Sequence, residues 1–166
     1  MSGSGRHDGA MATWEQLTAD HPDLMASVEA RLRATKHHVL ATLRRDGSPR
    51  VSGTEVQFHG GDLVMGMMLD SRKALDLRRD GRCALHANPG DGSMEGGDAK
   101  LAGTAEEVLD DAVLASYIGD VSPPEPFHLF RIELHEVVLT SLHPDGDRLL
   151  IDGWYGPAGR RVVERA

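Results

Sequence analysis

The chain has 166 residues, of which 40% are hydrophobic and 27% are charged, as in an ordinary globular domain with a sizeable core. Its formal net charge of −8 argues against nucleic acid or a membrane surface as a partner, because both call for basic patches. No apolar run approaches the roughly 20 residues that span a bilayer, and the first ten residues lack a signal-peptide core. The only cysteine, Cys83, cannot form an internal disulfide, which fits a reducing compartment. We therefore expect a cytoplasmic protein with no nucleic-acid or membrane partner.

Helical spacing appears first, between residues 14 and 35. Leu24, Val28 and Leu32 recur every four residues, and Pro22 predicts a new helix start after a short first turn. The same reasoning predicts two more helices, over residues 73–79 and 110–118.

Apolar runs between turn-forming residues predict the strands. The sequence RDGSP at residues 45–49 is typical of a tight turn, so the strands on either side of it form a hairpin. The strand after this hairpin is expected to complete a three-strand meander, and Gly103 predicts a bend or bulge in a longer strand. The expected strands cover residues 39–44, 50–58, 63–69, 82–87, 98–108, 127–142 and 148–154.

This order of elements predicts a mainly β protein with a few helices, class α+β, built as a small barrel. A doubly wound parallel sheet would need regular alternation of strands and helices, which the sequence lacks. We expect residues 1–13 to form a flexible tail, residues 14–155 to form a single domain, and residues 156–166 to form a basic tail.

The stretch from Asp70 to Ala74 is the most informative part of the chain. It places Arg72 and Lys73 in the first turn of an expected helix, after Asp70 or Ser71 as the N-cap. Cations are disfavoured there by about 0.3–1 kcal/mol each, because the free N–H groups of the first turn carry partial positive charge. A bound phosphate removes the conflict. The alternative is that both side chains bend away into solvent.

Three fragments resemble the pyridoxamine 5'-phosphate oxidase family of flavin-binding split barrels. They are LATL through DGSPRVS at residues 40–52, SRKA through LRRD with the following strand at residues 71–85, and the long strand at residues 98–108. The resemblance implies a split β-barrel that forms a homodimer and binds FMN or an 8-hydroxy-5-deazaflavin coenzyme at the subunit interface. The cofactor-binding positions that it implies are Arg50, Val51, Ser52, Met67, Met68, Ser71, Arg72, Lys73, Asp98, Lys100 and Trp154.

Several of these positions have a plainer interpretation. Arg50 fits an exposed base at a strand end, the two methionines fit core packing, and Asp98 fits a surface ion pair with Lys100. Strand alternation places Met67 and Met68 on opposite faces. Asp98 also departs from the family, in which an amide is usual.

The C-terminal substrate signature of the true oxidases is absent, so we do not expect oxidation of pyridoxamine phosphate. The resemblance instead implies a flavin-dependent oxidoreductase that transfers hydride to or from a small organic substrate, with His86 or Lys100 orienting that substrate. An acidic deazaflavin tail would need further bases, for which Arg78, Arg79 and Arg160 are candidates. The alternative function is a non-catalytic protein that binds or senses a flavin or haem. The spacing of the histidines predicts no metal site, and no catalytic residue is singled out.

Overall fold

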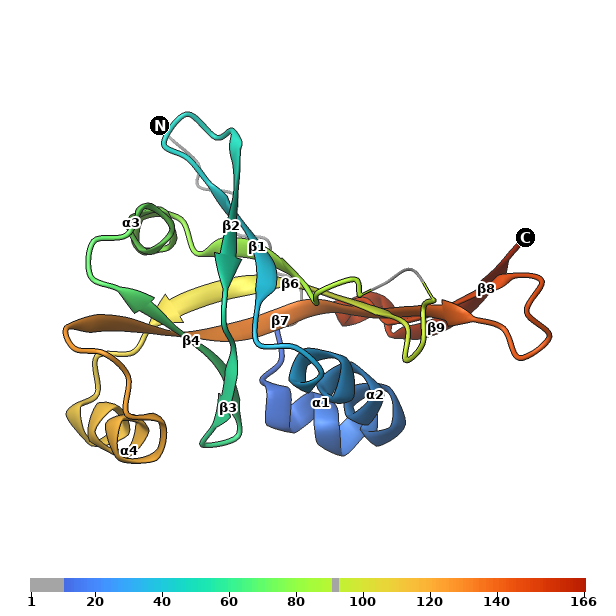
Figure 1. Ribbon diagram of the computed structural model, residues 1–166, viewed down its shortest axis with the longest axis horizontal. Coiled ribbons are helices and arrows are strands. Elements are labelled where there is room, and N and C mark those ends of the chain that lie inside the picture. Colours follow the sequence, from blue (N-terminus) through green and yellow to red (C-terminus); the bar gives the residue numbers. More distant parts are fainter. Residues whose placement is uncertain (1–10, 91–92) are drawn as a thin grey trace.

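The computed structural model describes residues 11–90 and 93–166, and an antiparallel sheet dominates it (Figure 1). Its α-helices are α1 (Trp14–Asp20), α2 (Pro22–Arg33), α3 (Arg72–Arg79) and α4 (Asp111–Val121), with a 3-10 turn η1 (Gly156–Ala158). Its strands are β1 (His38–Leu43), β2 (Pro49–Thr54), β3 (Gln57–His59), β4 (Asp62–Met68), β5 (Arg82–His86), β6 (Asp98–Glu107), β7 (Phe127–Leu142), β8 (Leu149–Trp154) and β9 (Arg160–Arg165). The predicted mixture of many strands and few helices is confirmed. In the described part of the chain, no helix has both the length and the apolar character to cross a membrane.

The strand order is β2-β1-β5-β6-β7-β4-β3, and β8 and β9 extend from the far end of β7. The strands at the two ends of this path, β2 and β3, are consecutive in the chain, and only Glu55 and Val56 separate them. The sheet therefore curls until its two edges come together, which makes a barrel that is split between β2 and β3. This arrangement confirms the predicted split barrel.

The predicted three-strand meander is wrong. The hairpin of β1 and β2 forms as expected, with Thr42 opposite Arg50. However, residues 50–58 make two strands rather than one, and β4 pairs with β3 and β7 instead of β2. The reason is a break in strand structure at Glu55 and Val56. There the chain leaves β2, which pairs with β1, and enters β3 at the opposite edge of the sheet.

The core lies between the inner face of the sheet and the pair α1 and α2, which Figure 1 shows packed together on one side. Leu24, Val28 and Leu32 are buried to 2%, 0% and 2% exposure, so the predicted apolar face of α2 is confirmed. A capping box between Thr13 and Gln16 begins α1.

The long strand β7 pairs with three other strands. β6 pairs along one edge of β7, and β4 and β8 pair with the two ends of its other edge. The register between β6 and β7 shifts between Ala102 and Gly103, as the glycine predicts. A Cβ on Gly103 would lie 2.1 Å from the carbonyl oxygen of Glu133, so only glycine fits this close approach.

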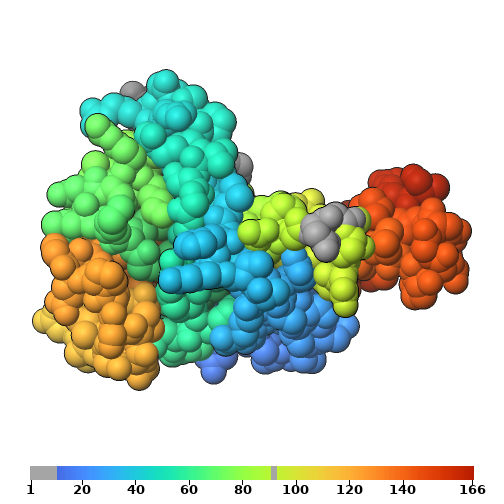
Figure 2. Space-filling model, in the orientation of Figure 1, coloured from blue at the N-terminus to red at the C-terminus, as the bar shows by residue number. Residues whose placement is uncertain are grey.

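The C-terminal segment differs from the expected basic tail. Residues 160–165 form β9, which pairs along the whole of β8, and the two strands project from the main body (Figures 1 and 2). Arg160 anchors them by binding both carboxylate oxygens of Asp23 on α2 at 2.7 Å and both of Asp152 on β8 at 2.9 and 2.7 Å. The Arg160 guanidinium holds the pKa of Asp23 well below its ordinary value. The carboxylates of Asp152 and Asp23 in turn raise the pKa of Arg160. At the other end, residues 1–10 of the expected tail lie outside the described residues, whereas Ala12 pairs with Leu134.

Candidate functional site

The first turn of α3 has the features of an anion-binding site. Ser71 is the N-cap, but its side chain makes no capping hydrogen bond, and its hydroxyl oxygen is buried with no partner among the described residues. No acidic residue lies in this turn. Arg72 is exposed and makes no hydrogen bond or ion pair within the described part of the chain. The turn thus presents free N–H groups, a free hydroxyl and an unpaired cation together, which is the donor set that a phosphate needs.

Lys73 connects this turn to the sheet. Its ammonium group donates a hydrogen bond of 2.5 Å to the carbonyl oxygen of Gly53 on β2, and the side chain is half-buried. Burial lowers the pKa of Lys73 below that of an ordinary lysine, while the carboxylate of Glu55 acts in the opposite direction. Lys73 therefore does not bend away into solvent, and it fixes the start of α3 against β2.

A buried carboxylate, that of Asp76, lies three residues after Lys73 on α3. Asp76 is 3% exposed and accepts hydrogen bonds from Thr42 Oγ1 at 2.9 Å, Arg50 Nε at 2.6 Å and Arg79 Nη2 at 3.1 Å. Burial raises the pKa of Asp76, but these hydrogen bonds outweigh it and hold the pKa below its ordinary value. Arg50 is accordingly not a free base at a strand end, since it is paired with a carboxylate. No local pattern in the sequence marks Asp76, because its partners Thr42 and Arg50 lie far from it in the chain.

A second network holds the turn that leads into α3. His128 on β7 is 7% exposed, and its Nδ1 lies 2.6 Å from a carboxylate oxygen of Glu107. Its Nε2 accepts a 3.3 Å hydrogen bond from the backbone N–H of Asp70, which has the left-handed φ of +54°. Glu107 also binds Arg78 at 2.9 Å, so both ends of α3 are connected to the sheet through one carboxylate. No sequence signal marked His128, because it lies in an ordinary apolar strand.

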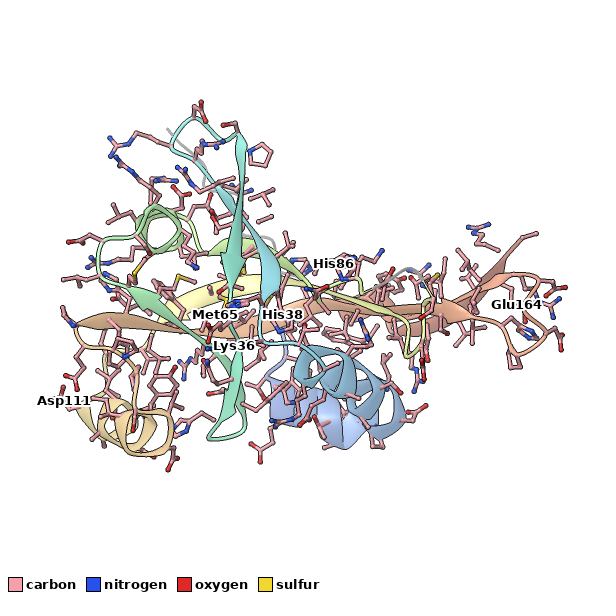
Figure 3. The ribbon with its side chains drawn as sticks, in the orientation of Figure 1. Lys36, His38, Met65, His86, Asp111 and Glu164 are labelled. Atoms are coloured by element: carbon pink, nitrogen blue, oxygen red, sulfur yellow. The ribbon has the colours of Figure 1, made fainter. Side chains whose placement is uncertain are left out.

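The outer face of the sheet, on β1, β2, β5 and β6, carries two exposed valines. Val39 and Val51 are 41% and 69% exposed, although strand alternation would place polar residues there. Cross-strand pairing puts them on one face with His86 and Lys100, which lie directly opposite each other. We call this surface, defined by Val39, Val51, His86 and Lys100, the open face. Figure 3 shows His86 among the side chains near the middle of the molecule.

The predicted site residues fall into three groups, and Met68 stands apart from all of them. Arg50 and Ser52 share the inner face of β2, beside α3 with Ser71, Arg72 and Lys73, whereas Val51, Asp98 and Lys100 belong to the outer face of the sheet. Met67 and Trp154 are buried in the core at 3% and 8% exposure, and Met68 is 77% exposed, so the two methionines do occupy opposite faces.

Asp98 and Lys100 do not pair with each other in the described part of the chain. One carboxylate oxygen of Asp98 is buried without a hydrogen-bond partner, whereas Lys100 is exposed. An unsatisfied buried carboxylate oxygen is costly, so this oxygen is suited to a partner from outside the chain.

One cluster of metal-ligating side chains occurs among the described residues, in the turn between β7 and β8. It brings potential ligand atoms of His143, Asp145 and Asp147 within 4.8 Å of one another, although the spacing of the histidines predicted no metal site. Arg148 lies 3.3–3.5 Å from all three side chains, so a guanidinium already supplies the positive charge in this turn.

The family model for pyridoxamine 5'-phosphate oxidase matches residues 24–141, which is more than half of the sequence. The chain belongs to the pyridoxamine 5'-phosphate oxidase family. The matched region includes β1, β2, the first turn of α3 and the open face. No curated protein sequence matches the chain.

Solved structures share the fold of this family member at low sequence identity. One is a pyridoxamine 5'-phosphate oxidase-related, FMN-binding protein from Nostoc punctiforme, with a TM-score of 0.59, 12% identity, and coverage of 86% of this chain and 94% of that chain. PhzG from Burkholderia lata, in complex with tetrahydrophenazine-1-carboxylic acid, has a TM-score of 0.58 at 17% identity and covers 92% of both chains. The haem storage protein HutZ from Vibrio cholerae has a TM-score of 0.53 at 17% identity, and the match covers 67% of this chain and 89% of that one. The family fold therefore occurs in proteins described as binding FMN and in proteins described as storing haem.

Proposed function

We propose that this protein binds a phosphorylated flavin and uses it to transfer hydride to or from a small organic substrate. The observation that carries the proposal is the first turn of α3, where Ser71, Arg72 and Lys73 present donors and charge and the turn itself contains no acidic residue. A phosphate accepts from the free N–H groups and the Ser71 hydroxyl, and it offsets the cations that otherwise oppose the helix dipole. The FMN-binding relative with the same fold supports this assignment.

The bound flavin would supply the hydride chemistry, so the protein needs no acid or base for that step. Ser71, Arg72 and Lys73, together with Arg50 on β2, would hold its phosphate. On the open face, His86 and Lys100 would orient the substrate through polar contacts, and neighbouring apolar side chains such as those of Val39 and Val51 would exclude water.

Among flavins, the structure favours FMN over the 8-hydroxy-5-deazaflavin coenzyme. The acidic tail of the deazaflavin calls for additional free bases, and the three candidates are all engaged within the chain. Arg78 binds Glu107, Arg79 binds Asp76, and Arg160 binds Asp23 and Asp152. Binding a second acidic group would require these ion pairs to break.

The open face supports a homodimer as the functional form. Exposed valines on the outer face of a sheet are typical of a surface that another protein covers. A second copy of the chain placed there would bury the valines and enclose the face that carries His86 and Lys100. We also place the protein in the cytoplasm, where the free thiol of Cys83 stays reduced; its burial raises the pKa to about 12, which makes the thiol unreactive.

A non-catalytic haem-binding role is the second candidate, and His86 is the residue that favours it. Its Nδ1 lies 2.5 Å from the carbonyl oxygen of Ala87 and donates its proton there in the neutral ring. The other nitrogen, Nε2, is then left with a free lone pair, which is the form that ligates iron. The haem storage relative supports this reading at the level of the fold.

The test is a visible spectrum of the purified protein, followed by fluorescence or absorbance titration with FMN, riboflavin, the deazaflavin coenzyme and haem. Our proposal expects FMN to bind at micromolar concentration or tighter, riboflavin to bind more weakly, and the bound flavin to be reduced by a nicotinamide donor. Tight binding without any reduction or turnover would indicate a carrier. A Soret band that is lost in His86→Ala would favour the haem role. Failure of FMN, riboflavin and the deazaflavin coenzyme to bind would refute the flavin proposal.

A further inference from the structure

Asp76 connects three elements beneath the first turn of α3. Its carboxylate is 3% exposed, and Thr42 on β1, Arg50 on β2 and Arg79 on α3 all donate to it. Breaking so buried an ion pair leaves an uncompensated charge, so these partners hold one another in a fixed arrangement. The pair of Asp76 and Arg50 is the shortest of the three contacts, at 2.6 Å.

Arg50 is held by one edge of its guanidinium only. Its Nε donates to Asp76, whereas Nη1 and Nη2 make no hydrogen bond within the described part of the chain. The guanidinium is planar and rigid, so fixing Nε also fixes the direction in which the terminal nitrogens donate. The side chain remains 23% exposed, which leaves that edge open to a ligand.

Arg50 lies one helical turn from the first turn of α3. Lys73 contacts Gly53, and Asp76 contacts Arg50, so two residues three apart on the helix contact two residues three apart on β2. These contacts place Gly53 beside the first turn of α3 and Arg50 beside the next turn, about 5 Å further along the helix axis. A phosphate at that turn would have Arg50 as a neighbour.

We propose that Asp76 is a positioning residue, which orients Arg50 to donate from its terminal nitrogens to the phosphate of the bound cofactor. This inference rests on the proposed function. Charge alone predicts the opposite effect, because a carboxylate near a phosphate repels it. The two explanations differ in sign, so an experiment separates them.

The experiment measures dissociation constants for FMN and for riboflavin, which lacks the phosphate, in Asp76→Asn and Asp76→Glu. Asparagine keeps the shape and removes the charge, whereas glutamate keeps the charge and displaces it by one methylene. We expect both variants to weaken FMN binding about tenfold and to leave riboflavin unchanged, since a charge-assisted hydrogen bond is lost or misaligned. Asp80→Asn is the matched control, because Asp80 lies at the end of the same helix and pairs with the exposed Arg82. In an Arg50→Ala background, the change at Asp76 should have no further effect on FMN.

Unchanged or tighter FMN binding in both Asp76 variants would overturn the proposal, and parallel losses of FMN and riboflavin would show a structural role instead. A second readout does not depend on the flavin: the ¹⁵N–¹H resonance of the Arg50 Nε–H group, titrated with inorganic phosphate. In the wild type we expect phosphate to shift this resonance, and in Asp76→Asn we expect the shift to disappear. A response to phosphate without flavin binding would refute the proposed function while leaving the role of Asp76 intact. No response in the wild type would refute the role of Asp76.

Discussion

Replacing Arg72 with alanine is the sharpest test of the phosphate site. Arg72 is exposed and has no partner among the described residues, so its removal breaks no internal contact. Any loss in affinity therefore belongs to the ligand. A hydrogen bond to a charged group contributes about 1.5–3 kcal/mol, so we expect the dissociation constant for FMN to rise about 10- to 150-fold. Lys73→Ala should weaken binding as well, but part of its effect comes from the lost bond to Gly53.

The assay is quenching of flavin fluorescence, with FMN and riboflavin titrated in parallel at two salt concentrations. Riboflavin affinity should be the same in wild type and Arg72→Ala, because it carries no phosphate. Arg82→Ala is the matched control, since it also removes one exposed arginine but pairs with Asp80 outside the proposed site. If FMN binds equally well to Arg72→Ala and wild type, the first turn of α3 does not hold the phosphate, and the reasoning from its misplaced cations is wrong.

Three further predictions concern stability. Gly103→Ala should lower the unfolding free energy by about 3 kcal/mol in urea denaturation, because its Cβ would lie 2.1 Å from the backbone oxygen of Glu133; a neutral effect would contradict the observed bulge. His128→Phe should cost about 1–3 kcal/mol and weaken FMN binding, because the N–H of Asp70 loses its acceptor; unchanged FMN affinity would show that this turn is held by other contacts. Burial opposes ionisation of Asp76, but its hydrogen bonds outweigh burial and lower its pKa, so its contribution to stability is full above the unfolded-state pKa of about 3.9 and is lost as pH falls through the folded-state value. Compared with the wild type, Asp76→Asn should therefore lose less unfolding free energy as the pH falls below about 4. The same pH dependence in both proteins would argue against this ion pair.

Local signals in the sequence predicted most of the fold. The spacing of Leu24, Val28 and Leu32 located α2, the turn at residues 45–49 located the first hairpin, and Gly103 located the bulge. The helix and the hairpin turn depend on contacts within a few residues, which are encoded where they occur. The bulge depends on the close approach of Glu133, and the glycine that this approach requires marks its position in the sequence. The pairing of β4 was missed because it depends on which strand closes the sheet, and the sequence of a single strand does not specify its neighbour.

The C-terminal segment was missed for a different reason. Residues 160–165 are mostly charged and exposed, so their composition resembles a tail, and β9 is held by backbone pairing with β8 and by Arg160. Neither the backbone pairing with β8 nor the ion pairs of Arg160 require an apolar pattern in the sequence. A charged edge strand also limits unwanted pairing with other chains, so polarity in this position is compatible with strand structure.

The candidate site shows the same division between local and distant information. The conflict of Arg72 and Lys73 with the helix dipole is local, and the sequence alone exposed it. The same sequence would pair Arg72 with Asp76 one turn later on the helix, as acidic and basic residues four apart commonly do. The fold instead turns Asp76 toward β2, where Arg50 and Thr42 satisfy it, and leaves Arg72 without an internal partner. A surface ion pair would have neutralised the first turn of α3. Because the carboxylate is buried, the positive charge at this turn stays available to a ligand, and that is the strongest structural reason to expect an anion there.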